Sequence, residues 1–169
     1  MSSEESFYGQ WKPLSRSERV GWLANAYTRH FGQKPFPGSI ELKAEVHLDG
    51  SDVDDVEGFF CAIGEAVNGP GGYFGQTING FADAALGGFG TTKPWKLVIR
   101  NHERAKLALG YAESHRYSSE YYRIASFADA DAKQTAQREL LDLANGRGKT
   151  LFAQIVEILE ERGVVVVLR

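Results

Sequence analysis

Apolar residues recur along the chain at two spacings, and each spacing predicts one kind of secondary structure. Intervals of three and four residues are typical of an amphipathic helix. Strict alternation is typical of a half-buried strand, and a short continuous apolar run is typical of a fully buried one. The helical spacing is found over residues 15–31, 53–67, 76–86, 103–125, 133–144 and 150–162, and the strand patterns over residues 40–48, 95–99 and 164–168.

Three strands separated by helices predict an α/β fold with a small parallel sheet and helices packed on it. The helical connections are long enough for right-handed crossovers between neighbouring strands. The last strand is apolar throughout, which is typical of a strand covered on both faces, so we expect it in the middle of the sheet.

Length and composition bound the class of protein. The 169 residues suit one domain, or one domain with an appendage. Apolar residues make up 43 % and charged residues 24 %, which excludes a disordered chain. No apolar run approaches the roughly 20 residues of a membrane helix, and the first residues show no secretion signal. A single cysteine, Cys61, excludes an internal disulfide, so a cytoplasmic location is expected.

The net charge of −3 is unevenly distributed. Residues 41–90 contain nine acidic residues and one basic residue, whereas the segments before and after carry a small positive charge. Phosphate contacts need Lys and Arg, so this acidic segment disfavours nucleic-acid binding. Two interpretations remain, a solvated acidic surface and attraction of a basic partner, and the first is the simpler one.

Two short motifs resemble ligand-binding loops but lack essential residues. The run from Gly146 to Thr150 resembles the end of a phosphate-binding loop, yet Leu143 stands where that loop needs glycine. The acids from Asp52 to Asp55 resemble a calcium loop, yet the position of the turn glycine is occupied by a glutamate. We expect these acids in the first turn of a helix, where the helix dipole favours negative charge.

No combination of side chains indicates a reaction or a metal site. The four histidines are far apart in the sequence and lack the spacing of a zinc site. Cys61 follows Phe60 on an apolar helix face, where a buried and inert thiol is expected. Since no nucleophile or base can be nominated, we expect a protein without cofactor, metal or enzymatic activity.

The short helix over residues 76–86 has two distinct faces. Its apolar residues are expected to pack on the sheet, and its polar residues, with Asp83 as the one charge, to point the other way. Glycine-rich loops carrying Tyr73, Phe74 and Phe89 lead into and out of it. These aromatic residues either surround a binding surface or belong to the core, and the sequence leaves both interpretations open.

Residues 72–83 (GYFGQTINGFAD) and 86–90 (LGGFG) resemble the signature of the barstar family of intracellular ribonuclease inhibitors. The resemblance covers about residues 44–109 and 148–169, with the strands and helices in the order of that family. It implies a barstar-like α/β domain over residues 44–169. Residues 1–43 are then an N-terminal helical extension, and about residues 110–147 are a helical insertion.

The resemblance implies a stoichiometric inhibitor that blocks the basic active site of a secreted or contact-delivered ribonuclease toxin. Asp83 matches the family's central aspartate, and Tyr73 matches the aromatic residue that packs on the catalytic histidine. The contact residues it implies are Tyr73, Phe74, Gly75, Gln76, Thr77, Asn79, Ala82, Asp83, Gly87 and Glu157. We expect a cytoplasmic monomer that forms a 1:1 complex with a basic ribonuclease or toxin, without nucleic acid or membrane as partner.

Three positions depart from the family, namely Thr77, Asn79 and Ala82, and the acid of the last helix is replaced by Ile158 with Glu157 beside it. One acidic contact is therefore kept and others are lost. Either Asn79 and Thr77 form hydrogen bonds to a differently built ribonuclease, or the scaffold binds another toxin. Two further alternatives are a small-ligand-binding α/β domain and a scaffold that interacts through the tyrosines of residues 103–125.

Overall fold

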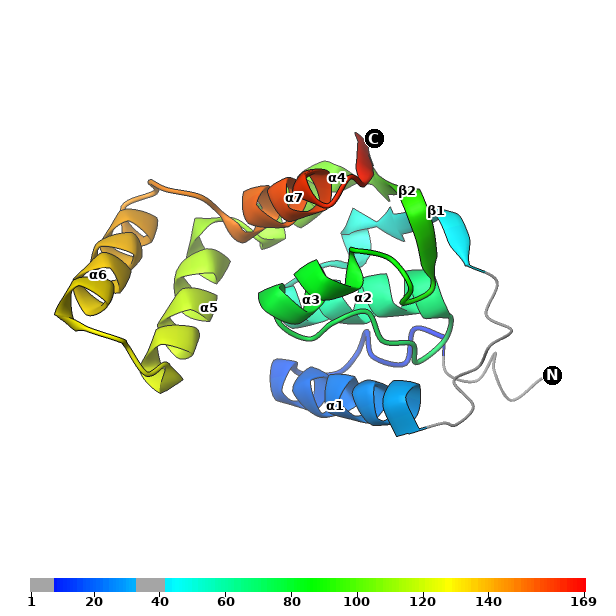
Figure 1. Cartoon of the computed structure of the whole chain (residues 1–169), viewed down its shortest axis with the longest axis horizontal. Helices are drawn as coiled ribbons and strands as arrows, with labels where there is room; N and C mark the ends of the chain where they lie inside the picture. The colour runs from blue at the N-terminus through cyan, green and yellow to red at the C-terminus, as the bar shows by residue number, and fades with distance from the viewer. Residues whose placement is uncertain (1–7, 33–41) are drawn as a thin grey trace.

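The computed structural model describes residues 8–32 and 42–169 of the chain (Figure 1). They form an α/β fold with a three-stranded sheet, as predicted. The elements in chain order are α1 (Arg16–Gly32), β1 (Lys43–Asp49), the 3-10 turn η2 (Gly50–Asp52), α2 (Val56–Asn68), α3 (Ile78–Ala84), β2 (Thr91–Arg100), α4 (His102–Ala108), α5 (Tyr111–Ile124), α6 (Ala130–Ala144), α7 (Leu151–Glu161) and β3 (Val165–Leu168). The first two residues predicted for the strand at 40–48 lie outside the described residues.

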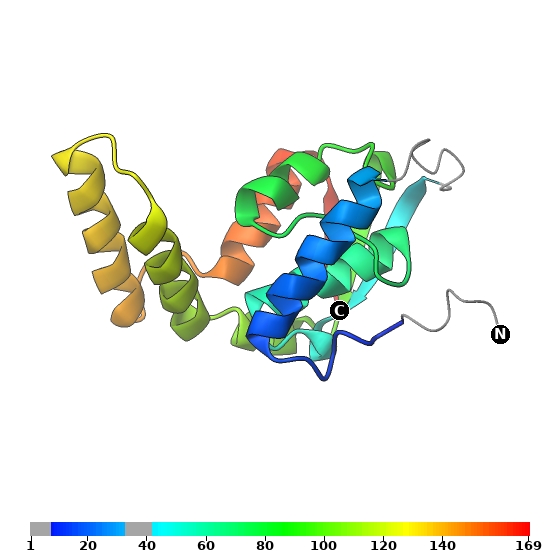
Figure 2. The ribbon, with the colours of Figure 1, turned by 90° about the horizontal axis from the view of Figure 1, so that it is seen from below.

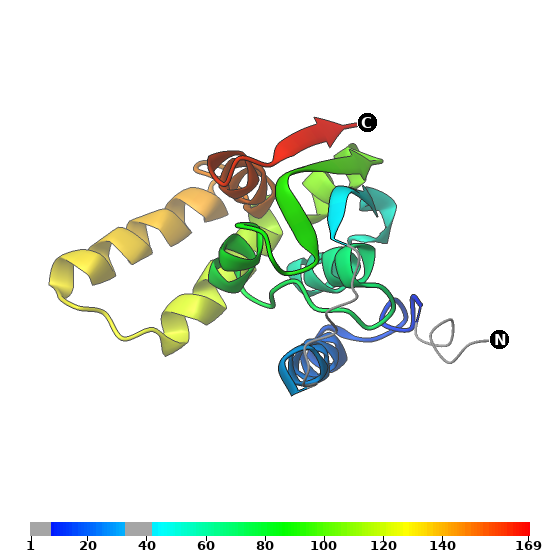
Figure 3. The same cartoon turned by 45° about the vertical axis from the view of Figure 1, so that its right-hand side comes forward.

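The sheet is parallel throughout, and its order is β1-β2-β3 (Figure 3). Val46 of β1 lies opposite Leu97 of β2, and Leu97 lies opposite Val166 of β3. The prediction that the last strand occupies the middle is therefore wrong, because β2 does. Val165 of β3 remains 56 % exposed. Its apolar run, residues 164–168, is only five residues long, and a run that short does not distinguish a central strand from an edge strand.

The core lies between the sheet and the helices that cover it. Figure 1 shows α2 between the sheet and α1, while α7 lies beside β3. Aromatic rings fill the centre, with centroids 5.4 Å apart for Phe59 and Phe81 and 5.8 Å apart for Phe74 and Trp95. Such edge-to-face pairs add to the stabilisation from buried apolar area.

The helix predicted over residues 103–125 is broken, which corrects the sequence interpretation. α4 ends at Ala108, and α5 begins at Tyr111 after Gly110. The apolar spacing continues across the break, but Leu109 is buried and Gly110 stands at the N-cap of α5, where the chain changes direction. Figure 2 shows that α5 and α6 form a helical hairpin, which extends away from the sheet.

Within residues 8–32 and 42–169, none of the helices combines the length and the apolar character needed to cross a membrane.

Candidate functional site

The candidate site is built on α3, the seven-residue helix that follows the glycine-rich loop. Thr77 is its N-cap, and the Thr77 hydroxyl accepts a hydrogen bond of 3.1 Å from the Gly80 amide. Ile78, Phe81 and Ala84 are buried, so the helix packs on the core through one side as predicted. Its opposite side, called here the α3 face, consists of the exposed residues Gln76, Thr77, Asn79 and Asp83.

Asn68, the last residue of α2, holds the loops on both sides of α3. Its side-chain amide donates hydrogen bonds to the Tyr73 carbonyl at 2.7 Å and to the Phe89 carbonyl at 2.8 Å. Gly75 is needed in the first loop, because its φ is +98° and an added Cβ would lie 2.6 Å from the Phe81 amide nitrogen. The α3 face is therefore presented by two loops whose backbones are fixed.

The aromatic residues of these loops belong to the interior, which decides the question that the sequence left open. Phe74 is fully buried, and Tyr73 is 7 % exposed. α1 covers Tyr73, since the Tyr27 and His30 rings lie 5.4 and 5.8 Å from the Tyr73 ring, and His30 stacks on Phe89 at 5.5 Å. The N-terminal extension thus occupies the side of Tyr73 that the resemblance assigns to a partner.

The remaining implied contact residues are distributed unevenly. Gly75 is buried, and Gly87 is half-buried beside Lys93. Ala82 is half-buried, and its carbonyl accepts a hydrogen bond of 3.3 Å from Arg162. Glu157 lies on α7 in an ion pair with Lys149. The structure therefore brings together Gln76, Thr77, Asn79 and Asp83, and it places Phe74 and Gly75 out of reach of a partner.

A cleft of about 330 Å³ adjoins the α3 face on the side of the helical hairpin. Its lining comes from α3 and its N-cap, from α5, from α6 and from α7: Thr77, Ile78, Asn79, Tyr117, Ser118, Tyr121, Tyr122, Glu139 and Gln154. The Ile78 amide donates a hydrogen bond of 3.2 Å to the Tyr117 hydroxyl, which joins α5 to the start of α3. The sequence indicated the tyrosines of this helix but not the surface opposite them.

Glu139 supplies the one charge of the cleft lining. The Tyr122 hydroxyl donates to its carboxylate at 2.5 Å, and Ser118 donates at 3.4 Å. Burial and the neighbouring carboxylate raise the pKa of Tyr122, so its hydroxyl keeps its proton. In the part of the chain that the structure describes, neither Glu139 nor Asp83 forms an ion pair.

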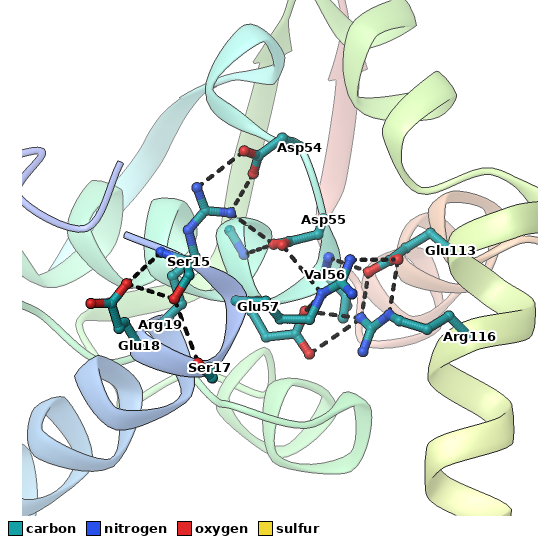
Figure 4. A network of polar contacts seen from close by, with 12 residues as sticks. Ser15, Ser17, Glu18, Arg19, Asp54, Asp55, Val56, Glu57, Glu113 and Arg116 are labelled. Carbon is teal, nitrogen blue, oxygen red and sulfur yellow. Dashed lines mark hydrogen bonds and ion pairs between the residues drawn. The ribbon is translucent and has the colours of Figure 1, made fainter. Parts of the chain in front are cut away.

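The acids before α2 form a different environment, the α2 charge network (Figure 4). Asp55 caps α2 by accepting a hydrogen bond of 2.6 Å from the Gly58 amide. Arg19, which is 4 % exposed, donates to Asp54 at 2.5 Å and to Asp55 at 3.0 Å. The prediction that these acids lie in the first turn of a helix is therefore wrong: α2 begins only at Val56, Asp55 is its N-cap, and Asp54 precedes it. Asp54 and Asp55 are tied to a cation of α1.

α5 enters the same network from the other side. Glu113 accepts a hydrogen bond of 3.0 Å from the Val56 amide at the start of α2. Arg116 contacts Glu113 at 2.5 Å and Glu57 at 2.9 Å, and burial raises the pKa of Glu57. The network thus connects α1, α2 and α5.

Most of the described acids of residues 42–90 are paired within the chain, although several of them, among them Glu45 and Asp54, remain exposed to solvent. Five of these acids pair with cations of this chain: Glu45 with Lys96, Asp52 with Lys12, Asp54 and Asp55 with Arg19, and Glu57 with Arg116. The Glu65 carboxylate accepts hydrogen bonds from the Gly9 amide and from the Trp11 indole.

Cys61 is buried, as predicted, and burial raises the pKa of its thiol to about 12, which disfavours the reactive thiolate. Among residues 8–32 and 42–169, no three His, Cys, Asp or Glu side chains are placed to hold a metal ion.

In comparisons with known proteins, no family model matches the chain, and no curated protein matches it.

Proposed function

We propose that the chain is a stoichiometric protein inhibitor of a ribonuclease, and that the α3 face enters the ribonuclease active site. The observation that carries the proposal is the state of Asp83. Among the described acids of residues 42–90, Asp83 alone has a carboxylate that makes neither an ion pair nor a hydrogen bond, and it is exposed. An exposed carboxylate on a fixed helix is suited to replace an RNA phosphate among the cations of such an active site.

The neighbouring residues support this assignment. Asn79 lies one helical turn before Asp83, and its amide can both donate and accept hydrogen bonds. Asn79 and Thr77 would then bind by hydrogen bonds where the barstar family uses charge. Occupying the active site requires no reaction, so we propose a cytoplasmic monomer without cofactor or enzymatic activity, bound 1:1 to its partner.

One observation favours a second candidate, a barstar-like scaffold that binds a different toxin. The resemblance assigns Tyr73 to the partner's catalytic histidine, yet the rings of α1 cover Tyr73. A partner that contacts the α3 face without reaching Tyr73 need not be a ribonuclease.

Depletion of ribonuclease activity separates the two candidates. The immobilised chain is incubated with the basic-protein fraction of the organism that encodes it, and cleavage of a fluorogenic RNA is measured before and after. The wild-type chain is expected to remove a ribonuclease activity, and the Asp83→Asn variant to leave it in solution. Glu103→Gln is the matched control, since Glu103 is an exposed acid of α4 that is already paired with Lys106, and it should deplete like the wild type. If no ribonuclease activity is removed, but electrophoresis of the bound fraction shows a protein that the wild-type chain retains and Asp83→Asn does not, the second candidate is favoured.

A further inference from the structure

The cleft between α3 and the α5–α6 hairpin has no role in the function proposed above. It shares Thr77 and Asn79 with the α3 face, so a protein bound to that face would also cover the opening of the cleft. Its volume of about 330 Å³ lies at the small end of the range for ligand pockets. It therefore suits one long side chain rather than a nucleotide or a helix.

The charge of the lining indicates which charge the bound side chain must carry. Glu139 is anionic, the other lining residues are neutral, and no Lys or Arg is among them. The hydroxyls of Tyr122 and Ser118 orient the carboxylate without neutralising it. An anionic group would be repelled, and an apolar group would take the Glu139 carboxylate out of water without a counter-ion, which is unfavourable. The cleft is built for a cation.

The aromatic rings favour binding of a guanidinium group over an ammonium group. Tyr121 is 51 % exposed, and its ring meets the Tyr122 ring edge-on at 5.5 Å. A planar guanidinium can stack on such a ring while it donates two parallel hydrogen bonds to a carboxylate. Its remaining N–H groups can reach the amide oxygen of Gln154, a second acceptor in the lining.

We propose that this cleft binds an arginine side chain of the partner protein, with Glu139 as its counter-ion and Tyr121 as its stacking platform. The inference rests on the proposed function in so far as that partner is the ribonuclease bound at the α3 face. It gives the α5–α6 hairpin a role in recognition.

The walls of the cleft are fixed before any partner arrives. The Tyr117 hydroxyl is bound to the start of α3, and Arg116 joins α5 to Glu57 of α2. On the side of α7, the Leu151 amide donates a hydrogen bond of 2.7 Å to the Ser114 hydroxyl. A preformed cleft avoids the ordering cost that a mobile hairpin would add to binding.

The direct test is a titration of the full chain with the peptide acetyl-Gly-Arg-Gly-amide at millimolar concentrations. The readout is the NMR signals of the side-chain amides of Asn79 and Gln154. The matched peptide contains citrulline, which keeps the shape of arginine and lacks its charge. We expect saturable shifts with the arginine peptide and at least tenfold weaker binding with citrulline. Equal affinities, or no saturable shift with arginine, would overturn the proposal.

Two variants locate the site. Glu139→Gln and Tyr121→Ala are each expected to weaken the affinity for the arginine peptide tenfold or more, whereas Glu103→Gln on α4, outside the cleft, leaves that affinity unchanged. Glu139 and Tyr121 are exposed, so both variants are expected to fold, and the urea unfolding midpoint checks this. Unchanged binding by folded Glu139→Gln would contradict the role of Glu139, and Tyr121→Ala provides the same test should Glu139→Gln unfold.

The ribonuclease depletion assay separates this inference from the function on which it rests. If the wild-type chain depletes the activity but Glu139→Gln does so equally well, the arginine site is wrong and the inhibitor stands. If the arginine peptide binds as predicted but no ribonuclease is depleted, the proposed inhibitor fails, and the cleft belongs to another arginine-bearing partner.

Discussion

Two acidic regions of this molecule differ in whether their carboxylates are paired with cations. In the α2 charge network, Asp54, Asp55 and Glu57 are paired with arginines of α1 and α5. On the α3 face and in the adjoining cleft, Asp83 and Glu139 have no ion pair within the described residues. The first region contains more acidic charge but offers little of it to a partner. A count of acidic residues along the sequence therefore does not show which of them can bind a partner, because some are paired with cations of the same chain.

The two regions also differ in the expected effect of removing one charged side chain. A buried ion pair that loses one partner leaves an uncompensated charge in the interior, whereas an exposed carboxylate remains solvated. The α2 charge network should thus determine stability, and the α3 face and the cleft should determine binding.

The largest effect is expected for Arg19→Ala. Arg19 is almost fully buried and bonds both Asp54 and Asp55, so its removal leaves Asp55 without its closest cation. We expect a loss of about 3–5 kcal/mol in the free energy of unfolding, measured by urea denaturation. Lys12→Ala is the control, because the Lys12–Asp52 pair is exposed and should contribute at most about 1 kcal/mol. Equal losses for the two variants would contradict the role of the α2 charge network in stability.

Asn68→Ala is expected to have the next largest effect. The variant leaves the carbonyls of Tyr73 and Phe89 without the donor that holds the two loops. We expect a loss of about 1–3 kcal/mol in the free energy of unfolding. The control is Asn145→Ala, whose side-chain amide bonds an exposed carbonyl at the end of α6. A loss no greater than that of the control would show that Asn68 does not hold the loops.

His30 predicts a pH dependence of stability. Burial lowers the pKa of His30 below its ordinary value of 6.5, so below that pH the unfolded chain takes up a proton that the folded chain resists. The free energy of unfolding should therefore fall as the pH is lowered from 7.5 to 5.5, and the contribution of His30 levels off below its folded-state pKa. The His30→Phe variant should show a shallower fall in urea denaturation at the two pH values. An equal fall in both proteins would contradict this origin.

The smallest effect on stability is expected for Asp83→Asn. Asp83 has no bonded partner in the described structure, so the free energy of unfolding should change by less than about 0.5 kcal/mol. Thermal denaturation of this variant beside Glu157→Gln provides the comparison. A large loss would mean that Asp83 supports the fold rather than a binding surface.

The sequence predicted local features well. The alternation over residues 43–48 and the helical spacing of α1, α2 and α7 depend on neighbouring residues, and the structure contains these elements. The two faces of α3 were predicted for the same reason, since Ile78 and Phe81 are buried while Asn79 is exposed. The buried thiol of Cys61 followed from its place on an apolar helix face.

Features that depend on distant segments could not be predicted. The burial of Tyr73 requires α1 to cross α2, and the pairing of Asp54 requires Arg19 from the same helix. The cleft requires Glu139, Gln154 and Asn79 to meet across more than 70 residues of sequence. Nothing in the local pattern around these residues indicates their partners.

The most direct test of the account is a titration of the ribonuclease captured by depletion with increasing amounts of this chain. Residual cleavage of fluorogenic RNA is plotted against the molar ratio. We predict that the wild-type chain abolishes cleavage at a ratio of about one, and that Asp83→Asn leaves cleavage intact at the same ratio while remaining folded. Full activity in an excess of the wild-type chain, or equal inhibition by Asp83→Asn, would contradict this prediction.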